Sequence, residues 1–305
     1  MRIAIIDLGT NTFNLLIADV LGTEKYDIVH KSKIPVKLGQ GGIDKQIITD
    51  DAFERGMNAL KKHKRTIESY KVNEYRALAT SAIRSSTNGY EFVKQVKEQI
   101  GLNIEVIDGD KEAQLIYHGV RQVVEFRESY DLIMDIGGGS TEFVIANKNG
   151  IVWAKSYKLG VSRLKEMFKP SDKITTNDII LLTNFLNESL IELSESISKF
   201  PCDRLIGSSG SFDSIVEMIA YKFNVKKRMQ QSCAKILPTE FNWVFDYLKN
   251  SSLEERMNTP GLVKMRADMI VISSIFINHI LDITSVRTIM RSKYALKEGA
   301  VRQLF

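Results

Sequence analysis

Short apolar runs alternate along the chain with longer stretches in which apolar residues recur every three or four positions. Apolar runs that end at glycine or hydroxyl residues are typical of buried strands, and the wider spacing is typical of amphipathic helices. In the first half this pattern predicts the order βββαβαβα. Its bounded strands are 2–7, 13–20, 75–79 and 104–107, and its helices are 51–71, 89–100 and 110–123.

The second half repeats this order and adds an insertion, 238–281, that is largely helical. Its predicted strands are 130–135, 141–146, 151–157, 203–207 and 286–290, and its other helices are 161–168, 177–198, 212–223 and 295–305. Alternating strands and helices indicate an α/β fold. We therefore expect two domains that flank a cleft, 1–126 and 127–305, with the helical insertion in the second and the charged segment 125–129 at the boundary.

One strand–turn–strand pattern occurs twice at a constant spacing of 128 residues. The matched pairs are Asp7 with Asp135, Gly9 with Gly137, Thr12 with Ser140, Ile17 with Ile145, and Ala18 with Ala146. The strands 75–79 and 203–207 keep the same spacing, and each delivers hydroxyl residues to a turn. Chance rarely aligns strands, turns and trailing residues together, so we infer an internal duplication.

The repeated turns have the composition of phosphate-binding loops. Three successive glycines, Gly137 to Gly139, let backbone N–H groups converge without obstruction by Cβ atoms. Asp135 and Glu142 bracket this turn, where a hard cation such as Mg²⁺ would lie beside phosphate oxygens. An ordinary glycine-rich hairpin is the alternative, but the second copy favours two loops that face each other across a cleft. Ligands in α/β sheets bind at the carboxyl ends of strands.

Two further side chains emerge at predicted strand ends. Arg84 follows a turn of small residues, where a guanidinium suits a bidentate contact with phosphate, although a surface arginine is the alternative. Glu112 lies in the first turn of a predicted helix. Its simplest role there is electrostatic, with Asp110 as the N-cap, because acidic residues stabilise a helix start. From that position Glu112 could also reach the cleft and deprotonate a water molecule.

Composition narrows the function classes. With 305 residues, of which 44% are hydrophobic and 26% charged, the chain has ample material for a core. No apolar run reaches membrane-spanning length, and Asp7 comes too early for a signal peptide. Cys202 and Cys233 lack metal-site spacing, which fits a reducing cytoplasm. The net charge of +5 permits a polyanionic ligand without requiring one.

Several catalytic classes are excluded by missing motifs. The chain has no P-loop signature, its four histidines are scattered, and the serine-rich segment 207–211 lacks the frame of a nucleophile elbow. The motifs that remain resemble those of the exopolyphosphatase and guanosine pentaphosphate phosphohydrolase family, within the superfamily of actin, hexokinase and chaperone ATPases. The matching segments are 7–13, 79–84, 109–113, 135–142, 207–210, 260–262 with 266–268, and 295–299.

The resemblance implies a duplicated ribonuclease H-like (actin-like ATPase) fold and hydrolysis of a terminal phosphoanhydride. Glu112 would be the general base, and Asp135 and Glu142, with Asp7 close by, would hold Mg²⁺ or Mn²⁺. The implied phosphate-binding residues are Gly9, Thr10, Asn11, Thr12, Arg84, Gly137, Gly138, Gly139, Ser140, Ser208, Ser209 and Gly210. The implied partner is polyphosphate or guanosine pentaphosphate, with no nucleic acid or membrane, and homodimerisation stays open.

The chain departs from the family pattern at two positions. Lys111 precedes Glu112 where relatives commonly have a second acidic residue, and Lys297 stands where an arginine is usual. Two alternatives therefore stay open: a kinase of the same superfamily that uses ATP, and a regulator that binds a phosphorylated nucleotide without turnover. The sequence does not rank polyphosphate against guanosine pentaphosphate. Asn14 occupies the position of Glu142 in the first copy, so we expect the second loop to carry the metal.

Overall fold

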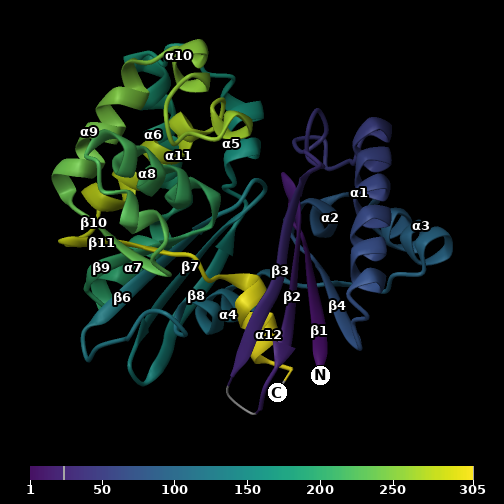
Figure 1. Cartoon of the computed structure of the whole chain (residues 1–305). Helices are drawn as coiled ribbons and strands as arrows, with labels where there is room; N and C mark the ends of the chain where they lie inside the picture. Colours follow the sequence, from purple (N-terminus) through teal and green to yellow (C-terminus); the bar gives the residue numbers. More distant parts are fainter. Residues whose placement is uncertain (23–24, 305) are drawn as a thin grey trace.

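The computed structural model describes residues 1–22 and 25–304, which form two mixed sheets with helices around and between them (Figure 1). The first sheet has the order β3-β2-β1-β4-β5. Its strands are β1 (Arg2–Leu8), β2 (Thr12–Val20), β3 (Tyr26–Pro35), β4 (Glu74–Ala79) and β5 (Ile104–Val106). The first three strands pair antiparallel, and β4 and β5 continue parallel to β1. This is the predicted ribonuclease H-like arrangement.

The second sheet has the order β10-β11-β9-β6-β7-β8 and so repeats the first sheet with one additional edge strand. Its strands are β6 (Tyr130–Ile136), β7 (Thr141–Asn147), β8 (Gly150–Tyr157), β9 (Cys202–Ser208), β10 (Cys233–Ile236) and β11 (Thr288–Ser292). The predicted duplication is confirmed. The register differs in one respect, because Asp7 faces Leu78 on β4, whereas Asp135 faces Ser208 on β9, two residues further along.

Helices cover the outer faces of both sheets (Figure 1). Beside the first sheet lie α1 (Asp50–Ser69), α2 (Ser81–Ser85) and α3 (Gly89–Ile100). The second sheet carries α5 (Val161–Phe168), α6 (Thr176–Ser189), α7 (Ile191–Lys199), α8 (Ser209–Lys222), α9 (Pro238–Asn250), α10 (Leu253–Met257) and α11 (Ile270–Asp282), with the 3₁₀ turns η1 (Lys226–Met229) and η2 (Lys264–Arg266).

Two helices lie between the sheets: α4 (Gly109–Val120), from the first half, and α12 (Leu296–Arg302), from the end of the chain. At two points the helices pack so closely that only glycine fits. A Cβ atom on Gly119 would lie 1.9 Å from the Ala295 carbonyl oxygen, and one on Gly299 would lie 1.8 Å from that of Leu115. Apolar residues of both sheets join this pair in one buried cluster. The last helix of the chain therefore closes the interface between the halves.

Some predicted elements differ from the structure. The single helix 177–198 is two helices, because the backbone of Leu190 (φ −109°, ψ 18°) departs from helical values while its side chain is wholly buried. Strand β11 begins two residues later than predicted, and β10 was missed because four residues give no periodic signal. The terminal helix ends at Arg302, and Phe305 lies outside the described residues.

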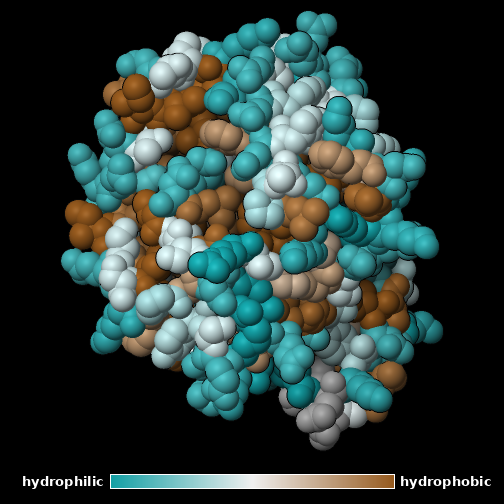
Figure 2. Space-filling model, turned by 90° about the vertical axis from the view of Figure 1, so that its left-hand side faces the viewer, coloured by the Kyte–Doolittle hydropathy of each residue, from teal (hydrophilic) through white to brown (hydrophobic). Residues whose placement is uncertain are grey.

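The outer side of the second half is mixed in character. Figure 2 shows apolar side chains gathered in several patches between polar ones on this side, and the exposed apolar residues include Tyr221, Phe223 and Leu237. Among the described residues, no helix is both long and apolar enough to cross a bilayer. Homodimerisation stays a prediction.

Candidate active site

A cavity of about 200 Å³ opens between the two halves. It collects the β1–β2 turn, the β6–β7 turn and the beginnings of α4, α8 and α12. Most of the predicted site residues line it: Asp7, Gly9, Thr10, Asn11, Thr12, Glu112, Asp135, Gly137, Gly138, Gly139, Ser140, Glu142, Ser209 and Gly210. The duplication and the folding of the halves against each other have therefore brought distant segments to one place.

The two glycine turns have the same internal geometry. The Gly9 N–H donates to the Thr12 carbonyl at 3.1 Å, and the Gly137 N–H donates to the Ser140 carbonyl at 3.0 Å. Within residues 1–22 and 25–304, no protein acceptor takes the backbone N–H of Thr10, Asn11, Gly138 or Gly139. Backbone donors left unpaired inside a protein call for an acceptor. Phosphate oxygens are suitable acceptors for such convergent N–H groups.

The turns also approach each other closely. A Cβ atom on Gly138 would lie 2.7 Å from the Asn11 amide nitrogen and 2.9 Å from the Cβ of Thr10, so only glycine fits there. The Ser162 hydroxyl, at the start of α5, donates to the Asn11 side-chain oxygen at 2.8 Å. Asn11 therefore also connects the halves, and its backbone N–H, rather than its side chain, is free to meet a phosphate.

Carboxylates form the floor between the turns. Asp135 and Glu142 lie directly opposite each other on β6 and β7, and the corresponding pair in the first sheet is Asp7 with Asn14. The Asn14 amide donates to Asp7 at 3.0 Å. The Ser156 hydroxyl on β8 donates to Glu142 at 2.7 Å. Sequence patterns did not predict that Ser156 contacts Glu142, because this contact depends on the pairing of β7 with β8.

Ser208 differs from its predicted role. Its side chain is wholly buried, and its hydroxyl donates to Asp135 at 2.7 Å instead of lining the cavity. The register of β9 against β6 causes this, because it places Ser208 opposite Asp135. The next residue, Ser209, has φ of +67° and does line the cavity. A non-glycine residue in the left-handed region is strained, and such strain is concentrated at functional sites.

The buried carboxylates titrate at unusually high pH. Burial, and then the charge of Asp135, raise the pKa of Glu142 to about 7. Burial is also the largest cause that raises the pKa of Asp135 and of Asp7. Burial therefore favours the protonated form of each carboxylate, and nearby positive charge such as that of Lys297 opposes it for Asp7 and Asp135.

The donor set fits a hard divalent cation. Asp135 and Glu142 present carboxylate oxygens side by side, and Mg²⁺ is commonly held by one or two carboxylates together with phosphate oxygens and water. Asp7, the third predicted ligand, lines the same cavity. The described residues contain no group of three His, Cys, Asp or Glu side chains already placed to hold a metal. The Asp7 carboxylate accepts a hydrogen bond from the Asn14 amide, whereas Asp135 and Glu142 lack such an amide partner in the part of the chain that the structure describes.

Glu112 lies in the first turn of α4 with 7% of its surface exposed. The helix begins at Gly109, one residue earlier than predicted, because Asp108 rather than Asp110 is the N-cap and accepts from the Lys111 N–H at 2.7 Å. Burial and the charge of Glu142 raise the pKa of Glu112 well above its usual value, although Arg84 opposes them. A carboxylate with a raised pKa at a cavity wall is suited to accept a proton near neutral pH.

Arg84 also departs from its predicted place. Its guanidinium donates to the Glu112 carboxylate at 2.9 Å and to the Ile107 carbonyl at 2.8 Å, and it does not line the cavity. The α2 helix, which follows β4, brings Arg84 to the start of α4, where Glu112 lies. It contacts the predicted base instead of lining the phosphate-binding cavity.

Nearly the whole chain matches one protein family. Residues 16–304 fit the model of the Ppx/GppA phosphatase family. The chain belongs to the Ppx/GppA phosphatase family.

Known structures of Ppx/GppA proteins have the same fold. An exopolyphosphatase from Cytophaga hutchinsonii is 37% identical, with a TM-score of 0.97 over 100% of this chain and 97% of that one. A family member from Aquifex aeolicus is 27% identical, with a TM-score of 0.81 over 100% and 97%. A bifunctional 3-dehydroquinate synthase/phosphatase from Fusobacterium nucleatum is 32% identical over 92% of this chain. The match covers 43% of the length of that protein, so this chain spans less than half of it.

This member of the family also carries cations that sequence patterns did not single out as site residues. Lys33, Arg266, Lys293 and Lys297 all line the cavity. The Arg266 guanidinium donates to the Gly210 carbonyl at 2.5 Å and to the Ser214 hydroxyl at 2.9 Å. Only Arg266 and Lys297 lay in recognised motifs, and neither had been given a role.

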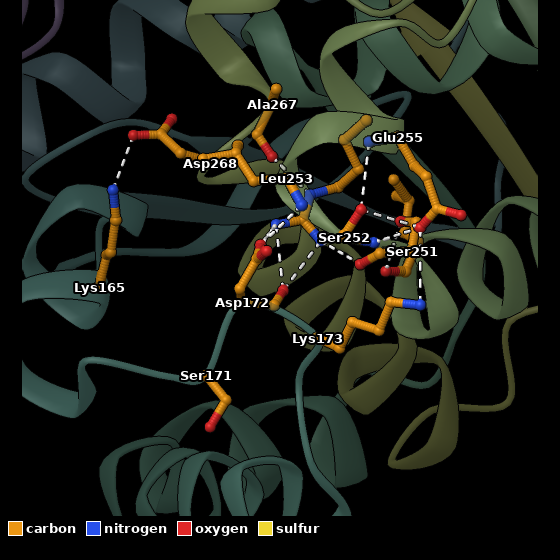
Figure 3. A network of polar contacts seen from close by, with 12 residues as sticks. Lys165, Ser171, Asp172, Lys173, Ser251, Ser252, Leu253, Glu255, Ala267 and Asp268 are labelled. Carbon is orange, nitrogen blue, oxygen red and sulfur yellow. Dashed lines mark hydrogen bonds and ion pairs between the residues drawn. The ribbon is translucent and has the colours of Figure 1, made fainter.

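A buried network supports the turn that carries Arg266. The Arg256 guanidinium, on α10, donates to the carbonyls of Ala267 at 2.7 Å, Ser251 at 2.5 Å and Asp172 at 3.2 Å. Figure 3 shows these partners converging, with Asp268 turned toward Lys165. Because Ala267 follows Arg266 directly, this network fixes η2 against α5 and α10.

Proposed function

We propose that this chain is a metal-dependent phosphohydrolase that removes the terminal phosphate from a phosphoanhydride chain, either inorganic polyphosphate or guanosine pentaphosphate. The observation that carries the proposal is the pair of facing glycine turns with unpaired N–H groups, placed beside the buried Glu112. In phosphoryl transfer a protein contributes mainly by positioning the reacting groups and by stabilising the negative charge of the transition state. The cavity offers both.

In this mechanism the turns 9–12 and 137–140 hold the terminal phosphate through their backbone N–H groups. Glu112 takes a proton from a water molecule, whose oxygen attacks the terminal phosphorus. The bridging P–O bond then breaks, and orthophosphate and a shortened chain leave. Arg84 is a positioning residue that holds the Glu112 carboxylate. Asp135 and Glu142 would hold Mg²⁺ or Mn²⁺, which neutralises charge on the phosphate oxygens.

Two observations outside the cavity support this reading. The chain is similar over its full length to an exopolyphosphatase of solved structure. Cys202 and Cys233 are both free thiols, which supports a proposed location in the reducing cytoplasm. The proposed partner is the phosphate substrate alone.

The test is a side-by-side assay of phosphate release from medium-chain polyphosphate and from guanosine pentaphosphate, with Mg²⁺ or Mn²⁺. Wild type should release phosphate from at least one of them, and Glu112→Ala should release none while melting like wild type. Full activity in Glu112→Ala would show that another group is the base. Transfer of phosphate from ATP to an acceptor would instead indicate a kinase, and tight binding without release would indicate a regulator.

A further inference from the structure

The carbonyl groups of the second glycine turn point toward the start of α5. The Val161 N–H donates to the Gly137 carbonyl at 3.0 Å, and the Ser162 N–H donates to the Gly138 carbonyl at 2.9 Å. In a trans peptide the C=O and the N–H that follows it point in opposite directions. These bonds therefore turn the N–H groups of Gly138 and Gly139 away from α5 and leave them for a ligand in the cavity.

A side chain, rather than the backbone, holds the next peptide of this turn. The Arg163 Nε donates to the Gly139 carbonyl at 3.2 Å, and its Nη1 donates to the Ile43 carbonyl of the first half at 3.1 Å. Arg163 has 8% of its surface exposed and does not line the cavity. By the same peptide geometry, its guanidinium turns the Ser140 N–H away from α5. Within the described residues, no acceptor takes this N–H.

The first copy of the turn shows what Arg163 replaces. The carbonyl that corresponds to Gly139 is that of Asn11, which accepts from the backbone N–H groups of Val36 and Lys37, both at 2.9 Å. The backbone supplies the donors in the first copy, whereas one guanidinium supplies the donor in the second. Backbone donors are present whatever the side chain, so only the second turn depends on a particular residue.

Burial of Arg163 is costly, which argues for a specific role. Its hydrogen bonds go to two carbonyls and not to a carboxylate, and its Nη2 atom is buried without an acceptor among the residues that the structure describes. Burial lowers the pKa of this guanidinium, although the charges of Asp44 and Glu166 oppose it. A buried cation without an ion pair destabilises a protein. Behind a turn that binds an anion, the same charge is favourable.

From these contacts we infer that Arg163 is a positioning residue for the second glycine turn. It orients the peptide between Gly139 and Ser140, so that the Ser140 N–H joins those of Gly138 and Gly139 in holding the terminal phosphate. The inference rests on the proposed function, in which the turns bind phosphate. Without the guanidinium, the Gly139 carbonyl loses its donor and the peptide is free to rotate.

The direct test follows the turn amides by NMR at saturating orthophosphate with Mg²⁺, in wild type and in Arg163→Met. In wild type the N–H resonances of Gly138, Gly139 and Ser140 should all shift when orthophosphate binds. In Arg163→Met the shift of Ser140 should fall severalfold, whereas that of Gly138 should persist, because backbone donors hold its peptide. A full shift of Ser140 in Arg163→Met would overturn the inference.

Inhibition by orthophosphate gives a second measurement. The loss of one N–H contact to a charged group predicts that Arg163→Met raises the Ki of orthophosphate and lowers kcat/KM on medium-chain polyphosphate, each by about tenfold. Arg163→Lys keeps the charge and one donor, so its values should lie between those of Arg163→Met and wild type. It carries the test if Arg163→Met does not fold. A wild-type Ki in either folded variant would contradict the inference.

Arg204→Met is the matched control, because it separates positioning from general destabilisation. Arg204 is similarly buried, with 9% of its surface exposed, but it donates to Asp131 at 2.9 Å and does not line the cavity. Its loss should lower Tm and leave the Ki of orthophosphate and kcat/KM unchanged. If Arg204→Met raised this Ki as much as Arg163→Met does, destabilisation would explain both effects and the inference would fail.

Failure of the proposed function gives a different result. If wild type releases no phosphate from any substrate while the amides shift as expected, hydrolysis is rejected and the role of Arg163 is supported. If wild type releases phosphate and Arg163→Met keeps the full Ser140 shift, only the role of Arg163 is rejected. If the turn amides of wild type do not respond to orthophosphate, the turns do not bind phosphate, and the inference is wrong as well.

Discussion

Asp135 and Glu142 face each other across β6 and β7, and neither forms an ion pair within residues 1–22 and 25–304. Like charges directly opposite in a sheet are destabilising. In the first sheet the same position pairs Asp7 with Asn14, whose amide donates to the carboxylate. The two copies thus differ by one negative charge at the same point of the same turn. This difference supports the proposal that a cation binds at the second copy.

Stability should fall as pH rises, and divalent cation should reverse the fall. The pKa of Glu142 is raised to about 7 from an ordinary value of 4.5, so the folded state holds a proton that the unfolded state has lost. Stability then decreases as pH rises through the window between these values, by on the order of 3 kcal/mol in total. Thermal melts without metal should show a lower Tm at about pH 8 than at about pH 5.5.

Mg²⁺ should raise Tm more at the higher pH, where the carboxylates are ionised. Glu142→Gln supplies the control, because it keeps the shape and the Ser156 contact but cannot ionise. The variant should lose much of both the pH dependence and the Mg²⁺ response. If wild type and Glu142→Gln showed the same pH dependence, Glu142 would not carry the effect.

The two aspartates should differ in their contribution to cation binding. Asp135→Asn should raise the Mg²⁺ concentration needed for half-maximal phosphate release by about tenfold or more, since it removes one of two adjacent carboxylates. Asp7→Asn should have the smaller effect, because Asn14 already engages that side chain. Titration of activity with Mg²⁺ measures both. A larger effect of Asp7→Asn would place the cation at the first turn.

Removal of Arg84 should shift the acid limb of the rate profile to higher pH. The Arg84 guanidinium lowers the pKa of Glu112 by its charge and by its 2.9 Å hydrogen bond, so its loss raises that pKa further. Less Glu112 is then ionised at neutral pH, and kcat/KM at about pH 6 should fall more than at about pH 9. Arg84→Met is the variant, measured as kcat/KM against pH.

Arg76→Met is the matched control for Arg84→Met. It removes another arginine–glutamate pair of the first sheet, the 2.8 Å contact with Glu105 at the surface. Its pH profile should follow that of wild type, because an exposed ion pair contributes little. An equal loss at all pH values in Arg84→Met would mean that Arg84 contacts substrate instead of tuning the base.

The contact between α4 and α12 should tolerate no additional methyl group. Gly119→Ala and Gly299→Ala would each place a Cβ within 2 Å of a backbone oxygen, so the helices must separate. Overpacking of this kind costs about 1–3 kcal/mol, sometimes more. Urea unfolding should show the loss, and Gln303→Ala, on the exposed surface just after α12, should be nearly neutral. Activity should fall as well, because these helices carry Glu112 and Lys297.

The sequence by itself determined the repeated unit. Each Asp-x-Gly turn is encoded within about fifteen residues by an apolar run, small residues and a second apolar run, and the constant spacing between the copies shows the duplication. These features are local, so pattern and composition suffice to find them. The same locality placed Glu112 at a helix start and gave most of the cavity lining.

Only the tertiary structure decided which side chains meet. The Ser208 hydroxyl donates a hydrogen bond to Asp135 because of the register of β9. The Arg84 guanidinium donates to Glu112 because β4, α2 and α4 converge. Lys33 of β3, Arg266 of η2 and Lys293 after β11 line one cavity, although no short pattern relates them. Contacts between distant segments depend on strand register and helix packing across the whole chain. The turns could therefore be recognised in the sequence, whereas the partners of their side chains required the fold.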